Sequence, residues 1–176
     1  MTGMNRELLG PLKTAIKLEI EGKRLFAEAA GKVTGRYARQ TFEFLLAEED
    51  KHVSRIREFY ESIEESGLIE PIALDDREAQ RNLDSFNDKL AEFRHEIKPT
   101  VSDIEAYRFA LKFENNSSDF YAEKMHEADN PHVKAFYRWL IGEEEMHARL
   151  LESCLKFAED PAAWFEERGA KSPDES

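Results

Sequence analysis

Apolar residues recur at steps of three and four along four long windows of this chain, which is the period of a helix that buries one face. No window of comparable length alternates with the period of two that a half-buried strand requires. The windows run from about Asn5 to Ala30, Tyr37 to Glu65, Ser102 to Ala128 and Asn130 to Ala158. The pattern therefore predicts an all-α fold.

Capping signals mark the ends of several windows. Ser102 is the expected N-cap of the third window, because Glu105 three residues later would complete a capping box. Asn130 is the expected N-cap of the fourth window, with Pro131 at the first helical position. Gly67 closes the second window, as glycine commonly does after a helix.

Short turns join the first window to the second and the third to the fourth, so we expect two antiparallel hairpins. The connection over residues 68–100 is long enough to cross the whole bundle and includes a predicted helical segment, Asp75 to Ile97. We expect a four-helix bundle over residues 1–160. A short C-terminal helix and a frayed tail would follow over 161–176, with Trp164 and Phe165 packed on the bundle.

The second hairpin repeats the first at a distance of 95 residues without a gap. The matched polar pairs are Glu19 with Glu114, Glu49 with Glu144, and His52 with His147. Core packing needs only apolar character and volume, so a repeat kept for packing would not preferentially match glutamate and histidine. The two halves therefore share a polar function.

All four matched glutamates stand in the apolar stripes of their helices, so we expect them to face the core. Buried carboxylates that lie close together need cations or protons, and Lys23 is the only basic residue in register with them. The two Glu-x-x-His pairs place each histidine on the same helix face as a glutamate. This arrangement is typical of bundles that bind two iron or manganese ions. The predicted metal ligands are Glu19, Glu49, His52, Glu114, Glu144 and His147.

The Glu-x-x-His spacing is a weak signal when it stands alone. Glu92 with His95 and Glu123 with His126 also match it, but neither pair has a mate 95 residues away. We expect those histidines and His132 to be solvated. The alternative for the paired set is a structural polar network without metal.

The charge balance narrows the range of partners. Twenty-five basic and 37 acidic residues leave a net charge of -12, which disfavours nucleic acid and anionic membranes. Cys154 is the only cysteine, so there is no disulfide framework and no Cys-x-x-Cys motif. The sequence has neither a signal segment nor an apolar run long enough to cross a bilayer, so we expect a cytoplasmic protein.

Four motifs resemble those of the ferritin-like superfamily and, within it, of rubrerythrin-like di-iron carboxylate proteins. They are LEIEGKRLF, LLAEEDKH, LKFENNSSDFY and LIGEEEMH, and the resemblance covers about residues 5 to 158. It implies a bundle that is usually a homodimer or a larger homo-oligomer. It also implies two iron ions that react with peroxide or dioxygen, and these ligand types would accept manganese too.

The sequence departs from that family pattern in two ways. Peroxide-reducing rubrerythrins usually have another carboxylate one turn after the third-helix glutamate, but Ser117 stands there, and Gly22 occupies the matching place. The ligand set then resembles a symmetric ferroxidase centre. There are also no four cysteines for a rubredoxin-like domain, so turnover would need an external electron donor such as a rubredoxin-like protein.

Several roles follow as hypotheses. Glu49 and Glu144 would bridge two ions, each of which would also bind one terminal glutamate and one histidine. Tyr121 would donate its hydroxyl to a ligand carboxylate, or simply pack in the core. Glu48 and Glu143 would orient the histidine rings, or lie on solvated helix faces.

The leading functional hypothesis is a di-iron oxidoreductase that reduces peroxide or dioxygen. One alternative is a ferroxidase or iron-storage protein without catalytic turnover. Another is a structural or regulatory subunit whose site holds no metal. Glycine at positions 22 and 142 costs helix stability, which close packing or room near the metals would explain.

Overall fold

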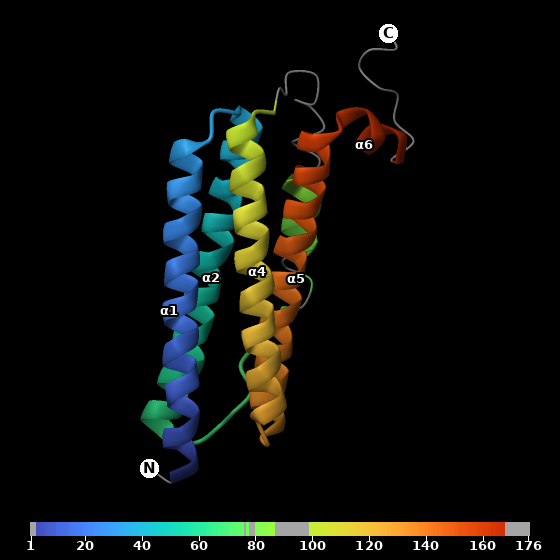
Figure 1. The fold of residues 1–176 in the computed structure, drawn as a ribbon. Helices are drawn as coiled ribbons and strands as arrows, with labels where there is room; N and C mark the ends of the chain where they lie inside the picture. Colours follow the sequence, from blue (N-terminus) through green and yellow to red (C-terminus); the bar gives the residue numbers. More distant parts are fainter. Residues whose placement is uncertain (1–2, 76, 78–79, 87–98, 168–176) are drawn as a thin grey trace.

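The computed structural model describes residues 3–75, 77, 80–86 and 99–167. Within these ranges there is no β-strand, and four long helices lie side by side (Figure 1). They are α1 (Gly3–Lys32), α2 (Arg36–Ser66), α4 (Val101–Glu127) and α5 (Pro131–Glu159), and a short helix α6 (Pro161–Glu167) follows them. The all-α four-helix bundle predicted from the sequence is confirmed.

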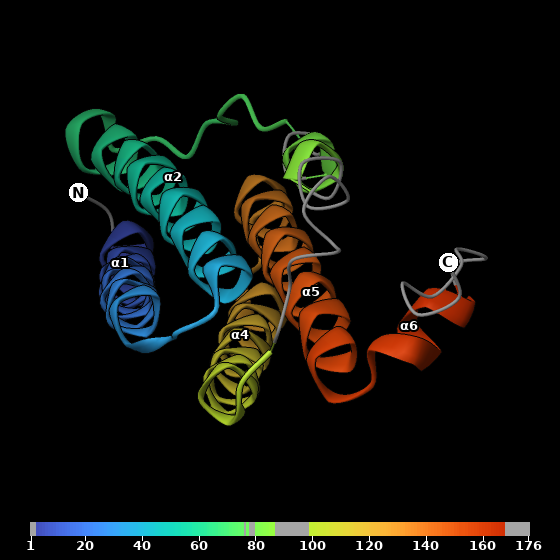
Figure 2. The same ribbon diagram turned by 90° about the horizontal axis from the view of Figure 1, so that it is seen from above.

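The helices follow an up-down-down-up order. α1 and α2 form one antiparallel pair, α4 and α5 form the other, and the chain between them returns from one end of the bundle to the opposite end (Figures 1 and 2). Residues 80–86 of this connection are helical. Asp75, the predicted first residue of this helix, is not helical, and its Oδ1 accepts a hydrogen bond from the Arg77 amide. Residues 87–97 of that prediction lie outside the described residues.

The capping box of α4 differs from the prediction. Thr100, not Ser102, is the N-cap: its backbone is extended, and its side chain accepts a hydrogen bond from the Asp103 amide. The Asp103 carboxylate accepts one from the Thr100 amide at 2.9 Å. Threonine and aspartate provide the same reciprocal hydrogen bonds two residues earlier, so Ser102 is already helical. Asp103 also accepts the Gly35 amide at 3.3 Å, which ties the α1–α2 turn to α4.

The other predicted helix ends are confirmed. Asn130 Oδ1 accepts hydrogen bonds from the amides of His132 at 2.8 Å and Val133 at 3.3 Å, and Pro131 follows as the first residue of α5. α2 ends at Gly67, whose φ of 68° lies in the left-handed region that favours glycine.

Two apolar clusters fill the bundle, one toward each end. The first includes Phe26, Phe42, Leu45, Tyr107, Ala110 and Leu151. The second includes Leu12, Ala15, Ile56, Phe59, Tyr121 and Leu140. On every long helix the predicted ligands fall between members of the two clusters, so apolar side chains enclose this polar layer from both ends.

α6 packs on the end of α5. The Trp164 ring lies edge-on to Phe157 with 5.3 Å between centroids, and its indole N–H donates to Ser153 Oγ at 3.2 Å. The Phe165 side chain and the tail over residues 168–176 lie outside the described part of the chain. No helix among the described residues has the length and hydropathy needed to cross a membrane.

Candidate metal centre

The structure brings the six predicted ligands together in the middle of the bundle. α1 and α4 each contribute one glutamate, whereas α2 and α5 each contribute a glutamate and a histidine one turn apart. None of the six is more than 2% exposed. They are Glu19, Glu49, His52, Glu114, Glu144 and His147.

One half of the site surrounds the His52 imidazole. Its Nδ1 lies 3.2 Å from Glu19 Oε2 and 3.3 Å from Glu144 Oε1. Glu49 Oε2 is slightly farther from the same nitrogen, at 3.8 Å. Three carboxylates from three helices therefore converge on one ring nitrogen.

The other half surrounds His147. Its Nδ1 lies 3.2 Å from Glu114 Oε1 and 3.4 Å from Glu49 Oε1. The two imidazoles are stacked, with 5.1 Å between their centroids and 18° between their planes. The halves thus follow the internal repeat, each with one histidine and one glutamate from a neighbouring helix.

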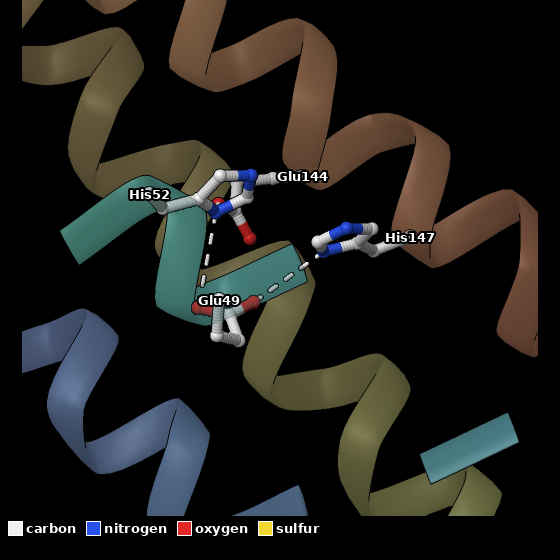
Figure 3. A group of neighbouring side chains, drawn as sticks. All are labelled: Glu49, His52, Glu144 and His147. Atoms are coloured by element: carbon white, nitrogen blue, oxygen red, sulfur yellow. Dashed lines mark ion pairs between the residues drawn. The ribbon is translucent and has the colours of Figure 1, made fainter. Parts of the chain in front are cut away.

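Glu49 lies between the two halves. Its Oε2 faces His52 and its Oε1 faces His147, so each oxygen of one carboxylate approaches a different imidazole (Figure 3). Glu144 completes the group, since one ligand atom from each of these four residues lies within 4.8 Å of the others. In this arrangement two cations could bind side by side, each next to one histidine, with the Glu49 carboxylate between them.

Many ligand atoms have no hydrogen-bond partner among the described residues, although they are buried. These atoms are both oxygens of Glu49 and Glu114, Oε1 of Glu144, both ring nitrogens of His147 and Nε2 of His52. Buried polar atoms are nearly always paired, so this concentration requires an explanation. Carboxylate and imidazole donors suit divalent iron, manganese or zinc, and such ions would satisfy these atoms.

The electrostatics show how costly the metal-free site is. Burial raises the pKa of Glu49 well above its usual range, and the charges of Glu19 and Glu144 raise it further. Burial and the Glu144 charge likewise raise the pKa of Glu114. Without metal, these carboxyls therefore hold protons in place of cations.

The pKa values of Glu19 and His52 shift in opposite directions, and both shifts favour the charged forms. Burial favours neutral Glu19, but its close neighbours Glu49 and His52 outweigh the effect of burial and lower the Glu19 pKa to about 2. Burial lowers the pKa of His52, but the nearby carboxylates of Glu143, Glu144 and Glu19 outweigh it and raise this pKa well above 6.5. Burial lowers the pKa of His147, so this ring is neutral and available as a ligand.

Tyr121 reaches the site from α4 and donates its hydroxyl to Glu19 Oε1. The side chain is fully buried, and it belongs to the apolar cluster on one side of the ligands. Its repeat mate Phe26 has no hydroxyl, so the two halves differ here. Tyr121 therefore both packs in the core and orients the carboxylate of Glu19, a predicted ligand.

Glu48 and Glu143 are not on solvated faces: they are only 4% and 6% exposed, so that interpretation is wrong. Glu143 Oε2 lies 3.6 Å from Nε2 of His52, which places it behind this ring. Glu48 instead accepts hydrogen bonds from Lys51 at 2.7 Å and from the Asn82 amide. The periodicity of a single helix could not reveal either burial, because Glu48 is covered by the connection and Glu143 lies against His52 of another helix.

Trp139 was not singled out from the sequence. Its ring lies edge-on to His52, with 5.8 Å between centroids and 80° between planes. The available signal was its place in the repeat, 95 residues after Phe44 and four residues before Glu143.

Of the two isolated Glu-x-x-His pairs, the one that the structure describes plays no part in the site. Glu123, His126 and His132 are exposed, as expected. Glu92 and His95 lie outside the described residues. Lys23 also points away from the ligands and pairs with Asp50.

Close packing explains the glycine at position 22 but not the glycine at position 142. A Cβ at Gly22 would lie 2.9 Å from Phe113 Cε1 and 3.2 Å from Glu49 Oε2. Any larger residue would therefore crowd a ligand oxygen. A Cβ at Gly142 would meet no atom within 4 Å.

Fold and site together define a ferritin-like bundle with a buried, dinuclear-type cluster of carboxylates and imidazoles. Residues 11–155 match the family model described as Rubrerythrin, and the chain belongs to this family. The ligand cluster fits the di-iron site that this membership suggests. No curated protein and no solved structure matches the chain.

Proposed function

We propose that the chain is a di-iron oxidoreductase that reduces peroxide or dioxygen at the six-residue site. The observation that carries the proposal is the position of Glu49, whose two oxygens face two different imidazoles. A carboxylate between two histidines is placed to bridge two metal ions and not to bind a single ion. The family membership supports iron as the metal, and manganese is the alternative with the same ligand types.

The residues divide into bridging and terminal ligands. Glu49 and Glu144 would bridge, because they belong to the helices that also carry the histidines. Glu19 would be a terminal ligand of the ion next to His52, because its Oε2 lies 3.2 Å from His52 Nδ1. Glu114 would be a terminal ligand of the ion next to His147, because its Oε1 lies 3.2 Å from His147 Nδ1.

The surroundings prepare the site for redox chemistry. When bound, two ferrous ions supply the two electrons that convert one peroxide and two protons into two water molecules. The two apolar clusters keep bulk water from the ligands, and the Tyr121 hydroxyl holds Glu19 in place. Within these 176 residues there is one cysteine, so an external donor must supply electrons for turnover.

The test is anaerobic loading with ferrous iron, followed by stopped-flow mixing with peroxide or with dioxygen. We expect two irons per chain and a fast absorbance change with peroxide. A change with neither oxidant would refute the proposal. The Glu49→Ala and Glu144→Ala variants should lose the metal, whereas Glu123→Gln on an exposed Glu-x-x-His pair should keep it.

One observation favours a ferroxidase as the second candidate. Ser117 is buried one turn after Glu114, where it supplies no additional carboxylate, and its hydroxyl has no partner among the described residues. The ligand set is then symmetric. Faster oxidation by dioxygen than by peroxide would favour this reading, and a large hollow homo-oligomer in place of a homodimer would favour iron storage.

A further inference from the structure

A cavity of about 520 Å³ opens beside the metal centre, between α5 and the connection that follows α2. Its lining includes Trp139 and Glu143, the two residues that stand behind the His52 ring. Glu143 Oε2 lies 3.6 Å from His52 Nε2, and the Trp139 ring lies edge-on to the same imidazole. A single layer of side chains therefore separates the cavity from a predicted metal ligand.

Comparison of the two repeated hairpins shows that, among the described residues, the cavity lies beside the second hairpin only. The corresponding positions on α2 are Phe44 and Glu48, and residues 80–86 cover both. Phe86 stacks on Phe44 with 4.7 Å between centroids, and the Asn82 amide donates to both Glu48 oxygens at 3.1 and 3.2 Å. The connection thus covers the α2 side and leaves the α5 side with a cavity.

The walls suit an aromatic molecule with an anionic group. Ile72, Leu74, Trp139 and Met146 supply apolar surface. The rim carries two exposed arginines of α5, Arg138 and Arg149, and neither forms an ion pair with any described residue. Glu145 also lies at the rim, whereas the Glu143 carboxylate faces His52.

The volume also selects the ligand. Pockets for small organic molecules measure roughly 300 to 1,000 Å³, and this cavity falls within that range. Peroxide or dioxygen, each close to the size of a water molecule, would fill only a small part of it.

We propose that this cavity binds the electron donor of the metal centre, a small aromatic reductant with an anionic group, such as a dihydroflavin nucleotide. The inference rests on the proposed redox function. The aromatic rings would pack against Trp139 and the apolar wall, and the anionic group would bind an arginine of the rim.

The reaction balances with this donor alone. One dihydroflavin loses two electrons and two protons and becomes the oxidised flavin. The Trp139–His52 contact would carry the two electrons toward the site, where they would restore the ferrous state of two bound iron ions. The protons leave to the solvent of the open cavity.

Binding is tested first on the metal-free full-length chain, with oxidised flavin mononucleotide as the probe and quenching of its fluorescence as the readout. We expect saturable quenching, and weaker binding of riboflavin, which lacks the phosphate. Replacing both arginines (R138Q with R149Q) should weaken flavin mononucleotide binding by about tenfold, the cost of a lost charged hydrogen bond. Arg108→Gln, which lies outside the cavity lining, should leave binding unchanged.

The decisive variant is Gly142→Leu, which adds a side chain at a cavity-lining position where a Cβ meets no atom within 4 Å. It should abolish flavin binding without loss of thermal stability, because leucine favours a helix more than glycine does. Gly10→Leu, at an equally open helical position outside the cavity lining, is the matched control. Unchanged flavin binding by Gly142→Leu would overturn the inference.

The second experiment measures the rate of electron transfer to the iron-loaded chain. Gly142→Leu should slow reduction of the oxidised protein by dihydroflavin mononucleotide by about tenfold or more, but not by dithionite, which does not need the cavity. Its reaction with peroxide in the ferrous state should match the parent protein. Failure of the parent protein to react with peroxide would count against the proposed function alone. Equal dihydroflavin rates in parent and variant would count against the cavity.

Discussion

Tyr121 on α4 donates its hydroxyl to Glu19 on α1, so a side chain from the second hairpin orients a predicted ligand of the first. We expect Tyr121→Phe to weaken metal binding by about 10- to 100-fold, as is usual when the hydrogen-bond partner of a metal ligand is lost. The fold should survive, because phenylalanine already occupies the matching position 26. Competition titration against a chromophoric chelator measures the change.

The control for this variant is Tyr137→Phe. Tyr137 is equally buried, but its hydroxyl has no hydrogen-bond partner among the described residues. It should bind metal like the parent protein. Equal affinities of the two variants would show that the Tyr121 hydroxyl does not support the site.

Substitution of Glu49 and substitution of Glu19 should differ in how many metal ions the protein loses. Glu49 faces both imidazoles, so Glu49→Gln should reduce the affinity for both ions. Glu19 approaches His52, so Glu19→Gln should affect one ion and leave the other bound. Elemental analysis after dialysis gives metal per chain, and a loss of both ions in each variant would contradict the division into bridging and terminal ligands.

The metal-free chain should lose stability as the pH rises above 6.5. Folding raises the pKa of Glu49 and Glu114 and, against the effect of burial, that of His52. Above pH 6.5 the unfolded chain has released these protons while the folded chain still holds them. The free energy of unfolding therefore falls with pH, by about 1.4 kcal/mol per pH unit for each retained proton.

Denaturant unfolding between pH 6.5 and about 9, with and without a chelator, tests this sign. Metal ions displace the same protons, so the loaded protein should show little slope and should bind metal more tightly at higher pH. Glu49→Gln carries no proton to lose, and its metal-free slope should be shallower. A flat profile for the metal-free parent would contradict the prediction.

The two interior glycines should respond in opposite ways to alanine. Gly142→Ala should raise the free energy of unfolding by up to about 1 kcal/mol and leave the metal content unchanged, because its surroundings are open. Gly22→Ala should lower metal affinity, since its Cβ would lie 3.2 Å from Glu49 Oε2. Paired metal titrations and thermal unfolding separate the two effects, and an unaltered affinity in Gly22→Ala would show that Glu49 can move aside.

Sequence patterns predicted the helices, the hairpins and the group of six because each depends on local periodicity and on the 95-residue repeat. The capping box forms at Thr100 and not at the expected Ser102, because Asp103 provides the reciprocal carboxylate three residues after Thr100. The solvated reading of Glu143 was wrong for a different reason. Its carboxylate lies against His52 of α2, and the periodicity of α5 alone does not reveal that neighbour.

By itself, then, the sequence determined the all-α bundle and which glutamates and histidines are equivalent in its two halves. The tertiary structure decided how those halves differ. The repeat makes Phe44 and Trp139 equivalent, yet a single connection can cover only one of them, and residues 80–86 lie over Phe44. Hydrogen bonds such as Tyr121 to Glu19 likewise join residues far apart in the chain, so only the packing of the helices could establish them.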